Sequence, residues 1–213
     1  MDDWILDRPD AIVAAHRAFV AAGAQIVLAG TFRALPSVQP RWRDVARAAV
    51  ALARRAAPRA VWASVGPTDQ DPAELAALVD WVARDVDGVV LETFVDPDAA
   101  RRAVAAVRRV WRGPLVASLV PDDAGRLQDE MPHDDALGAL IDAGADGAGF
   151  NCGTGPASVA LAVQQTTVSP LWARPAGGPG AVGVLRSLRA RCRWLGGCCG
   201  VDADTLRAAL QGV

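Results

Sequence analysis

Short apolar runs alternate with Ala- and Arg-rich helical stretches along almost the whole of this 213-residue chain. The runs at residues 24–29, 60–65 and 88–91 are each followed by a stretch with apolar residues at helical spacing. Runs that are apolar almost throughout are typical of parallel strands buried on both faces. A regular strand-then-helix order predicts right-handed crossover units, and roughly seven of them favour an α/β barrel over an open sheet.

The other expected elements continue this pattern to the end of the chain. Further strands are expected at residues 114–119, 145–150, 170–172 and 193–195. Helices are expected at residues 10–22, 43–57, 72–84, 98–111, 134–142, 156–164, 181–191 and 203–210. Because no low-complexity linker interrupts the series, residues 1–213 are expected to form a single domain.

Composition excludes several classes of protein. The net charge of −2 argues against a general nucleic-acid binder, which needs a surplus of basic charge. No apolar run approaches the roughly 20 residues of a membrane span. The acidic start of the chain lacks the basic and apolar regions of a signal peptide, so a cytoplasmic protein with reduced thiols is expected.

The cysteines are the most specific chemical signal. Cys198 and Cys199 are adjacent and flanked by glycine, and Cys152 follows an earlier apolar run. Three thiolates on two loops can hold one zinc ion and leave its fourth position open. The competing interpretations are three small buried side chains or, in a secreted protein, disulfides. In a reduced compartment this spacing favours metal binding.

Unusual residues gather where the predicted strands end. In α/β barrels the chemistry lies at the C-terminal ends of the strands. In this chain those positions hold Thr31 and Phe32, Glu92, Asn151 with Cys152, and the Cys198–Cys199 pair. All of them are therefore expected on one face of the fold.

These strand ends, taken in order, resemble the homocysteine S-methyltransferase family, which includes betaine–homocysteine methyltransferase and the homocysteine module of methionine synthase. The likeness runs from about Trp4 to the C-terminus. The segments that carry it are Gly30-Thr31-Phe32, Gly66-Pro67-Thr68, Leu91-Glu92-Thr93, Phe150-Asn151-Cys152 and Gly197-Cys198-Cys199-Gly200. The resemblance implies a TIM barrel, with Cys152, Cys198 and Cys199 as zinc ligands and Glu92 as the group that binds a substrate ammonium.

Two departures from the family pattern change the expectation. The family's first strand, with its Asp-Gly-Gly or Asp-Gly-Ala motif, has no counterpart in this chain. The family's Tyr-Pro-Asn type motif at the seventh strand is replaced by Ala173-Arg174-Pro175. The predicted fold is therefore a shortened TIM-type (β/α) barrel that lacks the family's first strand.

Several candidate residues have structural alternatives. Glu92 is expected to bind substrate, although a solvated or helix-capping carboxylate is the alternative. Thr31, Phe32 and Asn151 are candidate substrate-binding residues. A packing role explains Thr31 and Phe32 equally well, and Asn151 could instead orient the loop. His133 lies in a polar stretch and is expected to be exposed.

The leading functional hypothesis is a zinc-dependent S-methyltransferase of methionine biosynthesis. It would move a methyl group from an onium donor (S-methylmethionine, S-adenosylmethionine or betaine) to homocysteine or a related small thiol. The alternative is a non-catalytic or partner-completed barrel subunit that binds zinc or a small thiol, with a second copy or a partner chain closing the barrel. Zinc-activated hydrolysis is a third option, and three thiolates disfavour it because they make the metal a poor Lewis acid.

Overall fold

The computed structural model describes residues 2–211, and its elements follow the predicted order, with two short helices, α1 and η1, that were not predicted. They are α1 Asp2–Asp7, α2 Pro9–Ala21, β1 Ile26–Ala29, α3 Trp42–Arg55, β2 Ala60–Val65, α4 Ala73–Val82, β3 Gly88–Phe94, α5 Pro97–Arg108, β4 Leu115–Leu119, the 3-10 helix η1 Gln128–Glu130, α6 His133–Asp142, β5 Gly147–Cys152, α7 Pro156–Gln164, β6 Leu171–Pro175, α8 Ala181–Leu188, β7 Cys192–Leu195 and α9 Ala203–Leu210. Within this range no helix is long and apolar enough to cross a bilayer.

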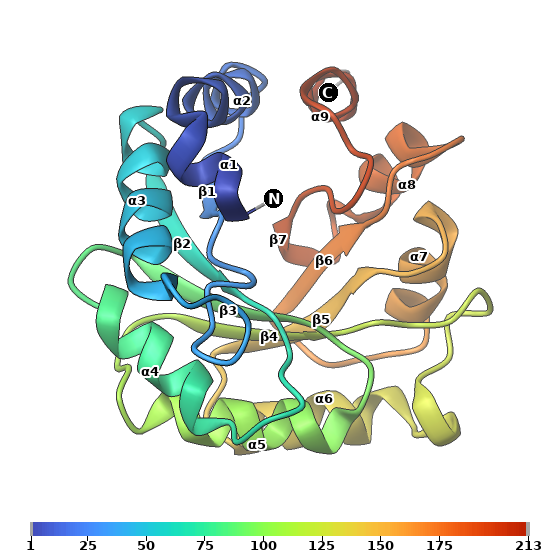
Figure 1. The fold of residues 1–213 in the computed structure, drawn as a ribbon. Helices are drawn as coiled ribbons and strands as arrows, with labels where there is room; N and C mark the ends of the chain where they lie inside the picture. Colours follow the sequence, from blue (N-terminus) through green and yellow to red (C-terminus); the bar gives the residue numbers. More distant parts are fainter. Residues whose placement is uncertain (1, 212–213) are drawn as a thin grey trace.

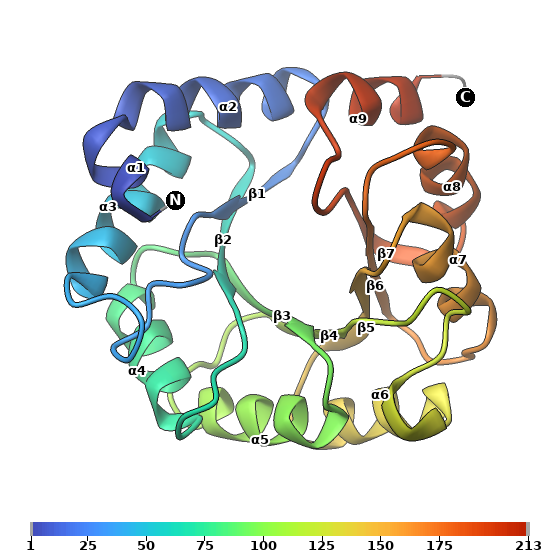
Figure 2. The same ribbon diagram turned by 45° about the vertical axis from the view of Figure 1, so that its right-hand side comes forward.

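Seven parallel strands form one curled sheet in sequence order, β1 to β7, and the helices lie on its outer side (Figure 1). In residues 2–211, β1 pairs only with β2 and β7 only with β6. Figure 2 shows the two edge strands, β1 and β7, facing each other across the open side of the sheet, with α2 and α9 above them. The predicted shortened TIM-type barrel is confirmed, and it is open between β1 and β7. This opening is called the seam below.

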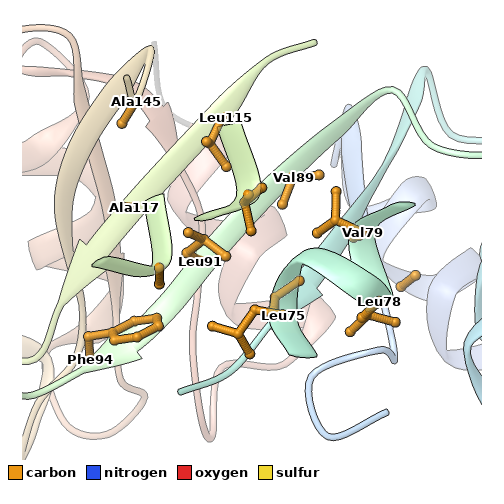
Figure 3. Close-up of a cluster of buried hydrophobic side chains, with 14 of the residues drawn as sticks. Leu75, Leu78, Val79, Val89, Leu91, Phe94, Leu115, Ala117 and Ala145 are labelled. Carbon is orange, nitrogen blue, oxygen red and sulfur yellow. The ribbon is translucent and has the colours of Figure 1, made fainter. Parts of the chain in front are cut away.

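The outer face of the sheet packs against the helices in one large apolar core. Figure 3 shows Leu75 and Leu78 of α4 against Val89 and Leu91 of β3, all of them buried. In β3 and β4 the next residue along the strand points to the other face, as the two-residue period of a strand requires. Both faces are covered, which explains why these strands are apolar almost throughout.

The inner face carries a second, smaller apolar cluster, here called the lower inner layer. Its buried members are Trp62, Val90, Val116 and Trp172, and the half-buried Trp194 packs against them. The rings of Trp62 and Trp172 stack across the interior with their centroids 5.8 Å apart. Large aromatic rings thus fill much of the inside of the open barrel.

Two sequence predictions need correction. His133, expected to be exposed, is buried as the first residue of α6. Its Nε2 lies 2.7 Å from the carbonyl oxygen of Gly125, and its ring meets Phe150 edge-on. The strand expected at residues 170–172 extends to Pro175, because Arg174 and Pro175 continue the pairing with β5.

Candidate metal and thiol site

A polar set of inner-face residues, here called the upper inner layer, lies two positions beyond the lower inner layer on β2, β3, β4 and β6. Ser64 follows Trp62, Glu92 follows Val90, and Arg174 follows Trp172. Ser118 of β4 and Asn151 of β5 complete the layer. Since side chains alternate between faces, the same strands present an apolar layer first and a polar layer nearer their C-terminal ends. Those ends are the mouth of the barrel.

The three predicted metal ligands converge at this mouth. The sulfur atoms of Cys152, Cys198 and Cys199 all lie within 4.8 Å of one another. Cys152 ends β5, whereas Cys198 and Cys199 lie in the loop after β7. In a tetrahedral zinc site with bonds of about 2.3 Å, sulfur ligands lie roughly 3.8 Å apart, so this donor set fits one ion with a small adjustment.

Close backbone contacts hold the cysteine loop against the end of β6 and the residues that follow it. Cys198 donates its N–H to the Pro175 carbonyl at 2.9 Å, and Gly177 donates to the Cys199 carbonyl at 2.7 Å. A side chain at Gly177 would overlap the backbone of Gly200, so glycine is needed for this approach. The loop is thus positioned by main-chain contacts.

Cys152 sits in a strained backbone conformation. Its φ of +63° lies in the left-handed region, which non-glycine residues seldom adopt. Burial, and after it the nearby sulfurs of Cys198 and Cys199, raise the pKa of the Cys152 thiol to about 12. Without a cation the Cys152 thiol therefore resists ionisation, whereas a bound divalent cation favours its thiolate form.

Asn151 anchors the same strand end and is fully buried. Its Oδ1 accepts hydrogen bonds from the Thr93 N–H at 2.9 Å and from the Ser118 hydroxyl at 2.8 Å. Its Nδ2 donates to the Thr93 hydroxyl at 2.9 Å and lies 3.7 Å from the Cys198 sulfur. Asn151 therefore orients the loops around the cysteines, and a direct contact with substrate stays a prediction.

Glu92 is buried in the upper inner layer and is already engaged by protein groups. Its carboxylate accepts a hydrogen bond from the Ser64 hydroxyl at 2.5 Å and forms an ion pair with Arg174 at 2.6 Å. Arg174 also donates from Nε to the Gly197 carbonyl at 2.8 Å, beside the cysteine loop. This guanidinium thus links Glu92 to the metal-ligand loop.

Arg174 was not among the residues predicted for the site. The alternation of inner and outer residues in β6, with Trp172 inward, is the signal that places Arg174 inward as well. Its partner Glu92 is 82 positions away in the sequence, so the ion pair needed the folded sheet to become visible.

Thr31 and Phe32 follow the C-terminal end of β1, at the same end of the sheet as the cysteines. The Thr31 hydroxyl donates to the Ser64 carbonyl at 2.7 Å and accepts from the Ser64 N–H at 3.0 Å. Thr31 is fully buried between β1 and β2, while Phe32 is half-buried with its ring against Gly66. Their roles toward a substrate stay predictions.

Comparison with known proteins agrees with this arrangement. Residues 2–212 match the sequence model of the homocysteine S-methyltransferase family. The chain belongs to the homocysteine S-methyltransferase family. The family resemblance predicted from the strand ends is thereby confirmed.

Two curated relatives of this family member have matching regions. One is the S-methylmethionine–homocysteine S-methyltransferase BHMT2 of Pongo abelii, 27% identical over 166 residues, which cover 71% of this chain and 45% of that protein. The other is methionine synthase of Mycobacterium tuberculosis, 28% identical over 183 residues, which cover 71% of this chain and 15% of that protein. The chain thus matches less than half the length of either relative.

Solved structures support the fold of this family member. The metallated form of homocysteine methyltransferase MmuM from Escherichia coli superposes with a TM-score of 0.83 at 20% identity. The match covers 97% of this chain and 86% of MmuM. The apo form of MmuM gives a TM-score of 0.81 at 21% identity.

Proposed function

We propose that this protein is a zinc-dependent S-methyltransferase that methylates homocysteine or a related small thiol. The observation that carries the proposal is the convergence of three cysteine sulfurs within 4.8 Å at the mouth of the barrel. Cys152, Cys198 and Cys199 would hold the ion. A zinc ion bound by three thiolates supplies a fourth position at which an incoming thiol loses its proton and becomes a nucleophile near neutral pH.

The Glu92–Arg174 pair suits an amino-acid acceptor. A zwitterion offers an ammonium and a carboxylate on one carbon, and the pair offers one group of each opposite charge. Glu92 would take the ammonium and Arg174 the carboxylate, exchanging their mutual contact of 2.6 Å for two contacts with substrate. Because Arg174 also contacts the cysteine loop, a bound acceptor would place its thiol toward the cysteines.

Methyl transfer needs an onium donor on the open side of the acceptor sulfur. In the step, a bond forms between the acceptor sulfur and the methyl carbon while the bond to the donor sulfur or nitrogen breaks. The donor leaves as a neutral sulfide or amine, and the acceptor's thiol proton has already passed to solvent. Phe32 would form one wall of the donor subsite, where an aromatic ring attracts a cationic methyl group.

Metal analysis and a substrate panel test the proposal. Purified protein is expected to contain about one zinc per chain. It is expected to methylate homocysteine with at least one of S-methylmethionine, S-adenosylmethionine and betaine. Cys198→Ser should lose both zinc and activity while keeping its circular dichroism spectrum. Full zinc content and full methyl transfer in Cys198→Ser would contradict the proposal.

The open seam favours a second candidate function. A barrel that is closed only when a partner is present would act as a zinc- or thiol-binding subunit. The same purified protein distinguishes the two candidates. If it binds zinc and homocysteine but transfers no methyl group from any of the three donors, the subunit function is supported.

A further inference from the structure

Asn151 lies between the metal-ligand loop and the strand end that carries Glu92. Its Nδ2 is 3.7 Å from the Cys198 sulfur and donates to the Thr93 hydroxyl at 2.9 Å. Its Oδ1 accepts a hydrogen bond from the Thr93 N–H at 2.9 Å. Thr93 directly follows Glu92 in β3. One buried amide therefore contacts a predicted metal ligand on one side and the neighbour of Glu92 on the other.

The backbone is strained on both sides of this amide. Thr93 has a φ of +72°, and Cys152, the residue after Asn151, has a φ of +63°. The left-handed region is an outlier for a β-branched residue such as threonine. Strained residues persist only where the surrounding structure holds them, and they cluster at ligand sites. Within residues 2–211, the side-chain hydrogen bonds that involve Thr93 are both made with Asn151, which thus holds Thr93 in its conformation.

A β-bulge makes the position of Glu92 depend on Thr93. The pairing of β3 with β4 shifts between Leu91 and Phe94, so Glu92 and Thr93 lie together opposite a single residue of β4. Such a bulge re-aims side chains beside active sites. Leu91 and Phe94 both pack in the outer core, as Figure 3 shows. A change in the Thr93 backbone would therefore turn the Glu92 carboxylate, whereas the residues on either side are fixed by the core.

A divalent cation at the cysteines would act on both sides of Asn151. Ligation would hold Cys152 in its left-handed conformation. The thiolate form of Cys198 would also accept from the Asn151 Nδ2 more strongly than the thiol does, because a charged acceptor strengthens a hydrogen bond. Both effects would fix the Asn151 amide and, through it, Thr93 and Glu92. In the other direction, an ammonium bound to Glu92 would hold Thr93 and thereby Asn151.

We infer that Asn151 and Thr93 are positioning residues that couple metal binding at the cysteines to acceptor binding at Glu92. Each ligand raises the affinity of the protein for the other, and by thermodynamic linkage the two factors are equal. The coupling passes through protein groups and does not require the acceptor sulfur to touch the metal. The inference rests on the proposed function in one respect, that the acceptor is an amino acid whose ammonium binds Glu92.

A ligand without sulfur separates this coupling from direct ligation of the metal. L-norvaline keeps the ammonium and carboxylate of homocysteine and has a methyl group in place of the thiol. Calorimetric titration of the zinc-loaded protein and of the zinc-free, reduced protein gives the norvaline affinity in both states. Zinc is expected to raise the norvaline affinity about tenfold. Saturating norvaline should raise the zinc affinity by the same factor, as measured by competition with a chromophoric chelator.

Two substitutions at Thr93 test whether the coupling passes through Asn151. Thr93→Val keeps the β-branched shape and removes the hydroxyl that accepts from Asn151, whereas Thr93→Ser keeps a hydroxyl. In Thr93→Val the coupling factor should fall from about ten to about three or less, because only the bond to the Thr93 N–H remains. Thr93→Ser should keep the wild-type factor. Ser118→Ala, which removes a hydrogen bond to Asn151 that does not connect it to Glu92 or Cys198, should keep it as well.

Nuclear magnetic resonance keeps the test valid if Thr93→Val does not fold. In the zinc-loaded wild-type protein, norvaline should shift the side-chain N–H resonances of Asn151. In the norvaline complex, zinc should shift the backbone N–H resonance of Thr93. The absence of both shifts would contradict a connection between the two sites through these residues.

Three further results would overturn the inference. The first is a norvaline affinity that is the same with and without zinc. The second is an equal coupling factor in the wild type and in Thr93→Val, which would assign the coupling to Arg174 or to the charge of the metal site. The third is no saturable norvaline binding up to about 10 mM. Coupling without methyl transfer would refute only the proposed function, whereas methyl transfer without coupling would refute only the inference.

Discussion

The two inner layers of the sheet lie only two positions apart on the same strands and have opposite chemistry. The lower inner layer is built from Trp62, Trp172 and two valines, without any charge. The upper inner layer holds the Glu92–Arg174 pair and the Asn151 network. The lower inner layer therefore stabilises the fold, whereas the upper inner layer carries the functional groups. Substitutions in the two layers of this sheet should have separable effects on stability and on activity.

The largest effect is expected from a metal ligand at the mouth. Cys152→Ser should reduce zinc content and methyl transfer to background, because two remaining thiolates no longer make a three-sulfur site. Metal analysis and a methyl-transfer assay measure these losses. The melting temperature of the metal-free variant should match that of the metal-free wild type within a few degrees. A large drop in that temperature would show that the mouth also carries the stability of the fold.

Removing an aromatic ring from the lower inner layer should have the opposite effect, lowering the stability of the fold and leaving zinc binding intact. Trp62→Ala deletes a buried side chain that stacks on Trp172, and should lower the free energy of unfolding by about 3–5 kcal/mol. Chemical denaturation measures this loss. The folded fraction of the variant should still bind one zinc per chain. Loss of zinc from a well-folded Trp62→Ala would break the proposed separation of the two layers.

A smaller effect is expected for Arg174→Met, which keeps most of the length of the side chain and removes its charge. If Arg174 takes the carboxylate of homocysteine, the KM for homocysteine should rise roughly 10- to 100-fold, since a hydrogen bond to a charged group is worth about 1.5–3 kcal/mol. Methylation of 2-mercaptoethanol, which has no carboxylate, serves as the control and should change little. An equal loss with both thiols would mean that Arg174 acts only by positioning the cysteine loop.

Ser118→Ala tests whether the polar layer also contributes to stability. The substitution removes one of the two hydrogen bonds to the Asn151 Oδ1 and leaves that from Thr93 in place. The expected loss is about 1 kcal/mol in the free energy of unfolding, with zinc content unchanged. A loss as large as that of Trp62→Ala would place stability in both layers.

The smallest effect on stability is expected for a substitution outside both layers, at Asp134. It serves as a reference for the changes within the layers. Hydrogen bonds from Thr166 and Thr167 lower the pKa of the exposed Asp134 carboxyl to about 2. Because the folded pKa is below the ordinary value of about 3.9, this contact stabilises the fold above about pH 4, and the contribution is lost as the pH falls to about 2. In Asp134→Asn the loss of stability between about pH 4 and pH 2 should therefore be slightly smaller than in the wild type. Acid unfolding followed by circular dichroism measures this difference, and the zinc content at pH 7 should be unchanged. An identical acid-unfolding curve would contradict the assignment.

Much of the architecture was predictable because it rests on local periodicity. The order of strands and helices, and the convergence of Cys152 with Cys198 and Cys199, follow from apolar runs and from the rule that parallel strands end on one side. Two features were not predictable in this way. The burial of His133 comes from a distant ring, Phe150, and the engagement of Glu92 comes from Arg174 on a different strand. Both depend on tertiary contacts that leave no local signature.

Helix α1 was missed for a similar reason. It is only six residues long, and among its described side chains one apolar residue, Ile5, is buried, which is too little for a helical period to be recognised. It packs against α3 and α2, so its conformation is set by neighbours that come later in the chain. The roles of Thr31 and Phe32 toward substrate, by contrast, stay predictions.

The alternation of the inner layers also determines which changes in chain length the protein tolerates. Deleting one residue within β2, β3 or β6 would turn every following side chain of that strand to the opposite face. Arg174 or Glu92 would then point into the helix layer, and the following residue, Pro175 or Thr93, would face the mouth. A scan of single-residue deletions should therefore show sharp intolerance inside these strands and broad acceptance in the loops, and the boundary between the two would mark the ends of the strands in solution.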